Sequence, residues 1–263
     1  MCMDFPRCWV VALTIGLLIV GCGGSTEPQK HPATFTYLAL GDSWPEGAHC
    51  GGCRTFAGLY ADGLAARTGR KIRFEDRTGQ AQPYFEELGG GSASLLRAVR
   101  LDSATRRVIA GADIIMVATG PNEIDASVEP AKAGTCGGKD EMACFRAQRR
   151  MWEKNFDAIL DEIEDLRAGK PTAIRLVSAA NPFVSEPSMS NGLPKDFATT
   201  EGALIFKNLN DALCTSAAKH DAVCVDVRPV LNGGTLEEPV DENSPKSMRA
   251  VAGALLAKKL PEL

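Results

Sequence analysis

Residues 35–43 read Phe-Thr-Tyr-Leu-Ala-Leu-Gly-Asp-Ser, a short apolar run that ends in a glycine, an acid and a serine. Such a run before a glycine is typical of a buried β-strand that ends in a tight turn. A serine at this turn would project its hydroxyl and its backbone N–H beyond the end of the sheet. The Gly41-Asp42-Ser43 turn alone is weak evidence of function, because Asp and Ser are also common helix caps.

The same alternation of strand and helix continues outward along the chain. Further strands are predicted at 71–75, 112–118, 172–178 and 222–227, and helices at 55–68, 92–110 (as two short helices), 141–168, 201–219 and around 248–256. Apolar strands separated by amphipathic helices predict a doubly wound, flavodoxin-like α/β fold. This is a three-layer sandwich with a five-stranded parallel sheet. Ligands bind such sheets at the carboxyl ends of the strands, which places loops 41–54, 76–91, 119–140, 179–196 and 228–246 near the expected site.

Two of these loops carry groups that suit the stabilisation of an oxyanion. The strand ending at Ala118 leads into Thr-Gly-Pro-Asn-Glu, so the Asn122 amide would lie near Ser43 as a hydrogen-bond donor. The second strand leads into Thr78-Gly79-Gln80, where Gly79 would offer a backbone N–H. In these blocks the chain resembles the SGNH, or GDSL, hydrolases over residues 35–260.

This resemblance implies ester hydrolysis through an acyl group on Ser43. It assigns Ser43 as the nucleophile and makes Gly79 and Asn122 oxyanion donors, with Gly120 opening the Gly-x-Asn motif. It implies a small-molecule or acylated substrate, and no metal or organic cofactor.

The chain departs from this family before its last helix, where the family has Asp-x-x-His. The matching stretch is Asp241-Glu-Asn-Ser244, so Asp241 is present while Ser244 replaces the histidine. A hydroxyl cannot accept the nucleophile's proton near neutral pH as imidazole does. Among the three histidines, His49 is the spatially plausible replacement base. We expect His220 to be a favourable charge at a helix end.

Two other interpretations stay open. A non-catalytic surface protein could keep the pocket to bind a small ligand or a glycan. A thiol redox protein is the third reading, and it rests only on Cys50-Gly-Gly-Cys53.

The N-terminus predicts export. Residues 9–20 are an almost unbroken apolar run, too short to span a bilayer of roughly 30 Å. The run ends in Ile-Val-Gly-Cys22, which looks like the lipobox of bacterial lipoproteins; an ordinary signal peptide with a chance cysteine is the alternative. We therefore expect a signal peptide at 1–21, a lipidated Cys22 with a flexible tether over 22–34, and a hydrolase-like domain over 35–263. The protein would be membrane-anchored through this lipid, at the cell surface or the periplasmic face.

The cysteines are consistent with export. Nine are present; two lie in the predicted signal and one is Cys22, which leaves six in the domain. An even number fits an oxidising compartment. Six cysteines allow 15 connectivities, of which the simplest is local pairing: Cys50–Cys53, Cys136–Cys144 and Cys214–Cys224.

The net charge of −4 shows no excess of positive charge, so nucleic acid is not an expected partner. We expect a monomer.

Overall fold

The computed structural model describes residues 34–88, 90–120 and 122–260. The predicted signal, Cys22, and the predicted tether except for its last residue lie outside the described residues. Within the described ranges, no helix combines the length and the apolar character needed to cross a bilayer.

The core of the domain is a five-stranded sheet in which every neighbouring pair of strands is parallel. The strands are β1 (Thr34–Gly41), β2 (Lys71–Arg77), β3 (Ile114–Ala118), β4 (Ala173–Val177) and β5 (Val223–Val225), in the order β2-β1-β3-β4-β5. The predicted α/β fold and its five strands are confirmed. The order changes direction beside β1, and Gly41 pairs with Ala118, so β1 and β3 end at the same level.

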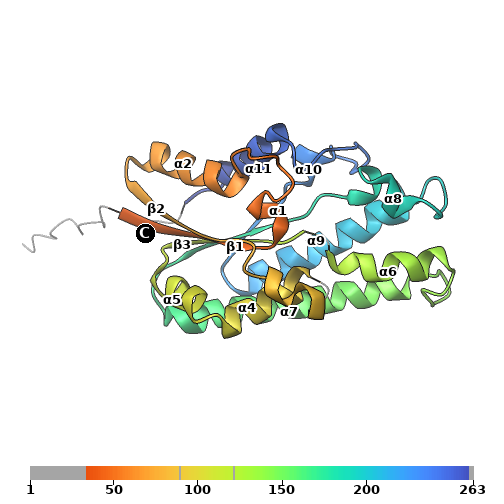
Figure 1. Ribbon diagram of the computed structural model, residues 1–263, viewed down its shortest axis with the longest axis horizontal. Helices are drawn as coiled ribbons and strands as arrows, with labels where there is room; N and C mark the ends of the chain where they lie inside the picture. Colours follow the sequence, from red (N-terminus) through yellow and green to blue (C-terminus); the bar gives the residue numbers. More distant parts are fainter. Residues whose placement is uncertain (1–33, 89, 121, 261–263) are drawn as a thin grey trace, which may run out of the picture. The chain divides into compact units, whose positions relative to one another are not determined.

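Helices cover both faces of this sheet (Figure 1). One face carries α2 (Phe56–Thr68), α10 (Arg228–Leu231) and α11 (Pro245–Ala257), and the other carries α4 (Gly91–Leu101), α5 (Ser103–Gly111), α7 (Ala143–Arg167) and α9 (Glu201–Lys219). Successive side chains of a strand point to opposite faces. Accordingly Tyr37 and Ala39 pack with the first group, whereas Leu38 and Leu40 pack with the second. Burial on both faces explains why β1 reads as a continuous apolar run.

Shorter elements follow the carboxyl ends of the strands. They are α1 (Ser43–Glu46), α3 (Phe85–Leu88), α6 (Asn122–Lys132), α8 (Pro187–Ser190), and the 3₁₀ turns Gln82–Tyr84 and Pro182–Val184. The expectation that 119–140 is a loop is wrong over its first half, because α6 forms there. Ile124 and Val128 lie four residues apart and are both buried in the core shared with α7, which stabilises this helix.

Three disulfides join Cys50 to Cys53, Cys136 to Cys144 and Cys214 to Cys224. The predicted local pairing is therefore confirmed.

Candidate active site

Ser43 begins α1 directly after the end of β1, where the chain turns sharply. Gly41 is required at this turn, since a Cβ there would lie 2.1 Å from the Ala118 carbonyl oxygen and 2.3 Å from Pro45. Asp42 caps the short helix by accepting a hydrogen bond from the Trp44 N–H at 3.2 Å. Ser43 is only half-buried, and its hydroxyl has no hydrogen-bond partner among the described residues.

The Asp42 carboxylate also joins the ends of β1 and β3. It accepts hydrogen bonds from the Gly120 N–H at 2.8 and 3.0 Å and from the Asn122 amide nitrogen at 2.9 Å. Burial raises the pKa of Asp42 to about 6, against the lowering effect of these hydrogen bonds. The amide nitrogen of Asn122 has two hydrogens, so one is held by Asp42 and the other is available for a ligand. The Gly120 N–H, in contrast, is already used.

Ser43 and Asn122 line one cavity of about 140 Å³. Its walls also contain Gly120 and His49, so this cavity brings together four of the residues singled out from the sequence. The remaining lining residues are Trp44, Asp125, Pro182, Glu186, Met189, Glu242 and Asn243.

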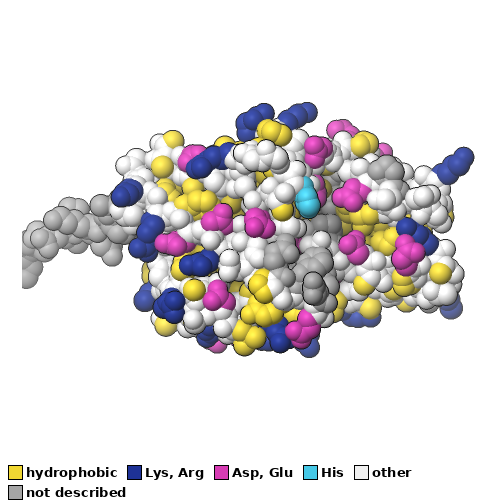
Figure 2. Space-filling view, viewed as in Figure 1, with side chains coloured by type: hydrophobic (Ala, Val, Ile, Leu, Met, Phe, Trp, Pro, Cys, Tyr) yellow, Lys and Arg dark blue, Asp and Glu magenta, His cyan; other side chains and the backbone are white. Residues whose placement is uncertain are grey.

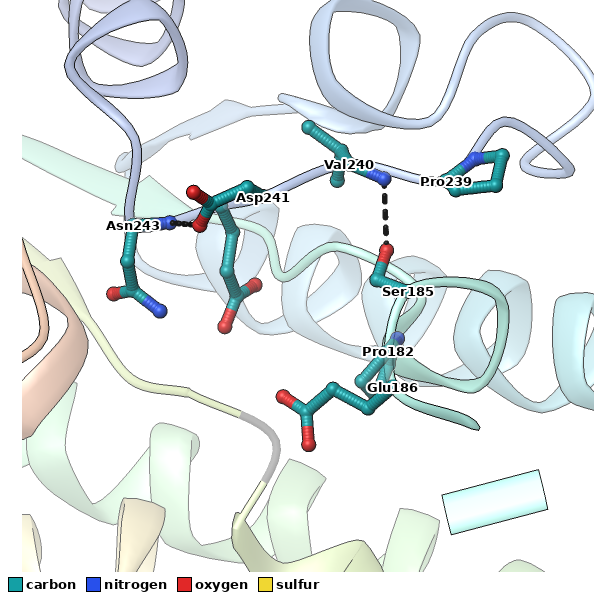
Figure 3. Close-up of a pocket in the computed structure, with 8 residues that line it drawn as sticks. Pro182, Ser185, Glu186, Pro239, Val240, Asp241 and Asn243 are labelled. Carbon is teal, nitrogen blue, oxygen red and sulfur yellow. Dashed lines mark hydrogen bonds between the residues drawn. The ribbon is translucent and has the colours of Figure 1, made fainter. Parts of the chain in front are cut away.

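A second cavity, of about 350 Å³, adjoins the first and shares Pro182, Glu186, Glu242 and Asn243 with it. Figure 3 shows Glu186 extending from one wall, with Asp241 and Asn243 on the opposite side. Each lining contains three acidic side chains, and neither contains a Lys or Arg among the described residues. On the face drawn in Figure 2, Asp and Glu side chains likewise surround the middle of the domain, while Lys and Arg lie mainly toward its rim.

Asp241 and Ser244 do not line the cavity that contains Ser43. Asp241 is exposed, lines the second cavity, and accepts a hydrogen bond from the Asn243 N–H at 3.1 Å. Ser244 caps α11, because its Oγ accepts a hydrogen bond from the Ser247 N–H at 3.2 Å. The Ser244 hydroxyl therefore has a structural partner.

Gly79 lies against α1, outside the lining of both cavities. Its φ of +73° is in the left-handed region that favours glycine, and an added Cβ would lie 2.7 Å from the carboxylate of Glu46. The structure thus explains the glycine by its conformation and by close approach to Glu46.

Two titratable groups outside the cavities, His220 and Asp226, have structural partners. The Nδ1 of His220 lies 3.0 Å from a carboxylate oxygen of Glu164, near the end of α9. Asp226 accepts two hydrogen bonds from the Arg228 guanidinium, at 2.7 and 2.8 Å.

Sequence reasoning missed Glu242 and the buried Glu123. Burial is the main cause that raises the pKa of Glu242 to about 7, and the carboxylates of Glu186, Asp42 and Asp241 add to it. Burial also raises the pKa of Glu123 to about 7, although a hydrogen bond from the Ser92 N–H opposes this. The one available signal for Glu242 was its place beside Asp241, before the last helix.

Comparisons with known proteins are informative at the level of the fold. No family model matches the chain, and no curated protein matches it. A lipase from a goat rumen metagenome aligns with a TM-score of 0.63 at 17% identity, over 84% of this chain and 95% of that one.

Two further solved structures align with a TM-score of 0.51. A variant of an acetyl-xylooligosaccharide esterase from Geobacillus has 11% identity, over 86% of this chain and 95% of its own. An α/β hydrolase from the metagenome of Lake Arreo, Spain, has 14% identity, over 85% of this chain and 94% of its own. The doubly wound α/β fold expected from the sequence is therefore one that this chain shares, at low sequence identity, with solved esterases and lipases.

Proposed function

We propose that this chain is a serine hydrolase that cleaves carboxylic esters through an acyl group on Ser43. The observation that carries the proposal is the shared cavity of Ser43 and Asn122, at the carboxyl ends of two adjacent parallel strands. This is where doubly wound sheets bind their ligands.

In the proposed reaction the Ser43 hydroxyl attacks the ester carbonyl carbon. The second amide hydrogen of Asn122 then donates to the oxyanion that develops, together with the backbone N–H of Ser43. Asp42 positions Asn122 through the 2.9 Å hydrogen bond, so this donor is in place before the substrate binds. Prearranged donors of this kind are typically worth 10²–10³ in kcat each.

The absence of histidine at position 244 predicts slow turnover. Losing the base of a serine triad costs about 10⁶ in kcat, while oxyanion donors and substrate binding retain about 10³–10⁴ over water. The same absence favours a second candidate, a non-catalytic protein that binds a small ligand or glycan in the retained cavity. Its supporting observation is that the hydroxyl of Ser244 caps a helix.

The Ser43 cavity alone, at about 140 Å³, is smaller than the roughly 300–1,000 Å³ of typical small-molecule sites. Acetyl esters, which need the least room, are therefore the first substrates to test. Long-chain acyl esters, which would extend into the adjoining cavity of about 350 Å³, are the comparison.

The test uses the purified full-length protein with p-nitrophenyl acetate and a fluorophosphonate probe, read by intact mass. We expect ester hydrolysis above the buffer rate and one phosphonyl adduct, and we expect Ser43→Ala to abolish both. Ser103→Ala, the same substitution at an exposed serine, is the matched control and keeps both. Hydrolysis and labelling that survive Ser43→Ala would assign the activity to another group. Complete inertness of the unmodified protein would favour the binding protein.

We also propose that the protein is exported and anchored to a membrane by a lipid on Cys22. The three disulfides support an oxidising compartment.

A further inference from the structure

One acidic side chain of the Ser43 cavity has no role in the reaction as written above. Glu242 lies in the loop that leads into α11 and lines both cavities, so its side chain stands at their junction. It is half-buried, and its carboxyl group has no hydrogen-bond partner among the described residues. A carboxyl group that faces the nucleophile's cavity and has no structural partner is free to exchange a proton there.

The backbone on both sides of Glu242 is held in place. Before it, the Val240 N–H donates to the Ser185 hydroxyl at 2.9 Å (Figure 3). After it, the Asn243 N–H donates to Asp241 at 3.1 Å, and Ser247 donates from its hydroxyl to the Asp241 carbonyl at 2.7 Å. These hydrogen bonds hold the loop backbone on both sides of Glu242 and so restrict the direction of its side chain. The neighbouring Asp241 is exposed.

From this arrangement we propose that Glu242 is the general base that accepts the proton of the Ser43 hydroxyl. The inference rests on the function proposed above. As the Ser43 oxygen bonds to the ester carbonyl carbon, its proton passes to a carboxylate oxygen of Glu242. When the carbon–oxygen bond of the ester breaks, the leaving alcohol oxygen takes that proton. A water molecule then repeats both transfers to release the acid and restore Ser43, so no further reactant is needed.

The electrostatics of the cavity suit this role. A carboxylate with an ordinary pKa is a weak base near neutral pH, and an efficient base has a pKa near the working pH. Burial and the nearby carboxylates bring the pKa of Glu242 to about 7. The groups facing it are Asp42 at the end of β1, Glu186 before α8, and Asp241 on its own loop.

Two further titratable groups line the cavity, Asp125 of α6 and His49. His49 is the competing base, but it is exposed. Glu242 is the more buried of the two, and hydrogen bonds hold the backbone of its loop, so it has less freedom to lose when it acts as the base.

The test compares Glu242→Gln, which keeps the size of the side chain but cannot accept the proton, with Glu237→Gln, the same change at an exposed position nearby. Initial rates with p-nitrophenyl acetate and rates of phosphonyl labelling are measured from pH 5 to 9, with melting curves for folding. We expect the unmodified protein to gain activity as the pH rises through about 7, where Glu242 loses its proton. Glu242→Gln should lower kcat at least about tenfold and remove this rise, whereas Glu237→Gln should keep both.

Two other variants keep the test decisive if Glu242→Gln folds poorly. Glu242→Asp retains a carboxylate and should preserve the shape of the pH profile at lower kcat. Glu186→Gln removes a negative neighbour, lowers the pKa of Glu242, and should shift the rise to lower pH.

The outcomes separate this inference from the proposed function. If Ser43 is labelled and Glu242→Gln retains kcat within twofold, Glu242 is not the base while the serine hydrolase stands. If His49→Ala removes the activity instead, His49 is the base. If the unmodified protein neither hydrolyses nor labels, the proposed function fails and the role of Glu242 fails with it.

Discussion

Glu123 is a buried carboxyl group directly behind the site, one residue after Asn122. The Ser92 N–H donates to one of its oxygens, while the other oxygen has no partner within the described part of the chain. Gly91 is essential to this arrangement, because a Cβ there would lie 2.0 Å from the Glu123 carboxylate. Burying the charged form is costly without a second partner, so the folded protein favours protonated Glu123.

This preference predicts how stability depends on pH. The pKa of Glu123 is about 7 in the folded state against an ordinary 4.5. Between these values the folded state binds more protons than the unfolded state, so the free energy of unfolding falls as the pH rises through this window. The loss is at most on the order of 3 kcal/mol from this residue. We expect Glu123→Gln to reduce the difference in stability between pH 5 and pH 8, as measured by urea unfolding.

Asp42 and Glu242 also have raised pKa values, of about 6 and 7. In Glu123→Gln the slope of the free energy of unfolding against pH should therefore become smaller but not disappear. Glu129→Gln, at an exposed position of the same helix, is the control and should keep the full slope. Equal slopes for Glu123→Gln and the unmodified protein would show that Glu123 is charged in the folded state.

At the level of single elements, α11 begins with a hydrogen-bonded cap. Its first residue is Pro245, and the preceding Ser244 accepts a hydrogen bond from Ser247. Serine is among the preferred N-caps, and proline suits the first helical position. Position 244 therefore satisfies a backbone donor that would otherwise be left without a partner.

We expect Ser244→Ala to destabilise the domain by about 1 kcal/mol, because the Ser247 N–H loses its acceptor. Chemical denaturation gives this value directly. Ser244→Asp keeps a capping oxygen and should remain near the stability of the unmodified protein. An alanine variant as stable as the unmodified protein would mean that the cap contributes nothing.

The elements also show which parts of the fold were predictable. The five strands could be predicted because burial on both faces makes a strand apolar throughout. Helix α6 could not be predicted, because the glycines and prolines around it are typical of loops. Its buried apolar side chains are those of Ile124 and Val128.

The same contrast holds within the site. The rule that ligands meet the carboxyl ends of strands brought Ser43 and Asn122 together. The rule could not tell which of Asp241 and Glu242 lines the Ser43 cavity. The direction of a side chain in a loop depends on hydrogen bonds such as that between Val240 and Ser185.

At the scale of the whole molecule, the proposed membrane anchor is independent of the domain's chemistry. Changing Cys22 to Ala removes the thiol that would carry the lipid. We expect this variant to leave the membrane fraction while the domain keeps its three disulfides and its melting temperature. Fractionation of cells that express either form, followed by immunoblotting, measures this. A Cys8→Ala variant is the control, since it changes a cysteine within the predicted signal, and it should stay with membranes. If Cys22→Ala also stays there, the lipid assignment is wrong.

The spacing of the disulfides has a consequence for how the protein matures. The paired cysteines are 3, 8 and 10 residues apart. In the proposed export, the second cysteine of each pair follows the first within a dozen residues, before the next pair has appeared. We therefore expect oxidation in the order of appearance to give these three pairings, with little need of an isomerase to correct them.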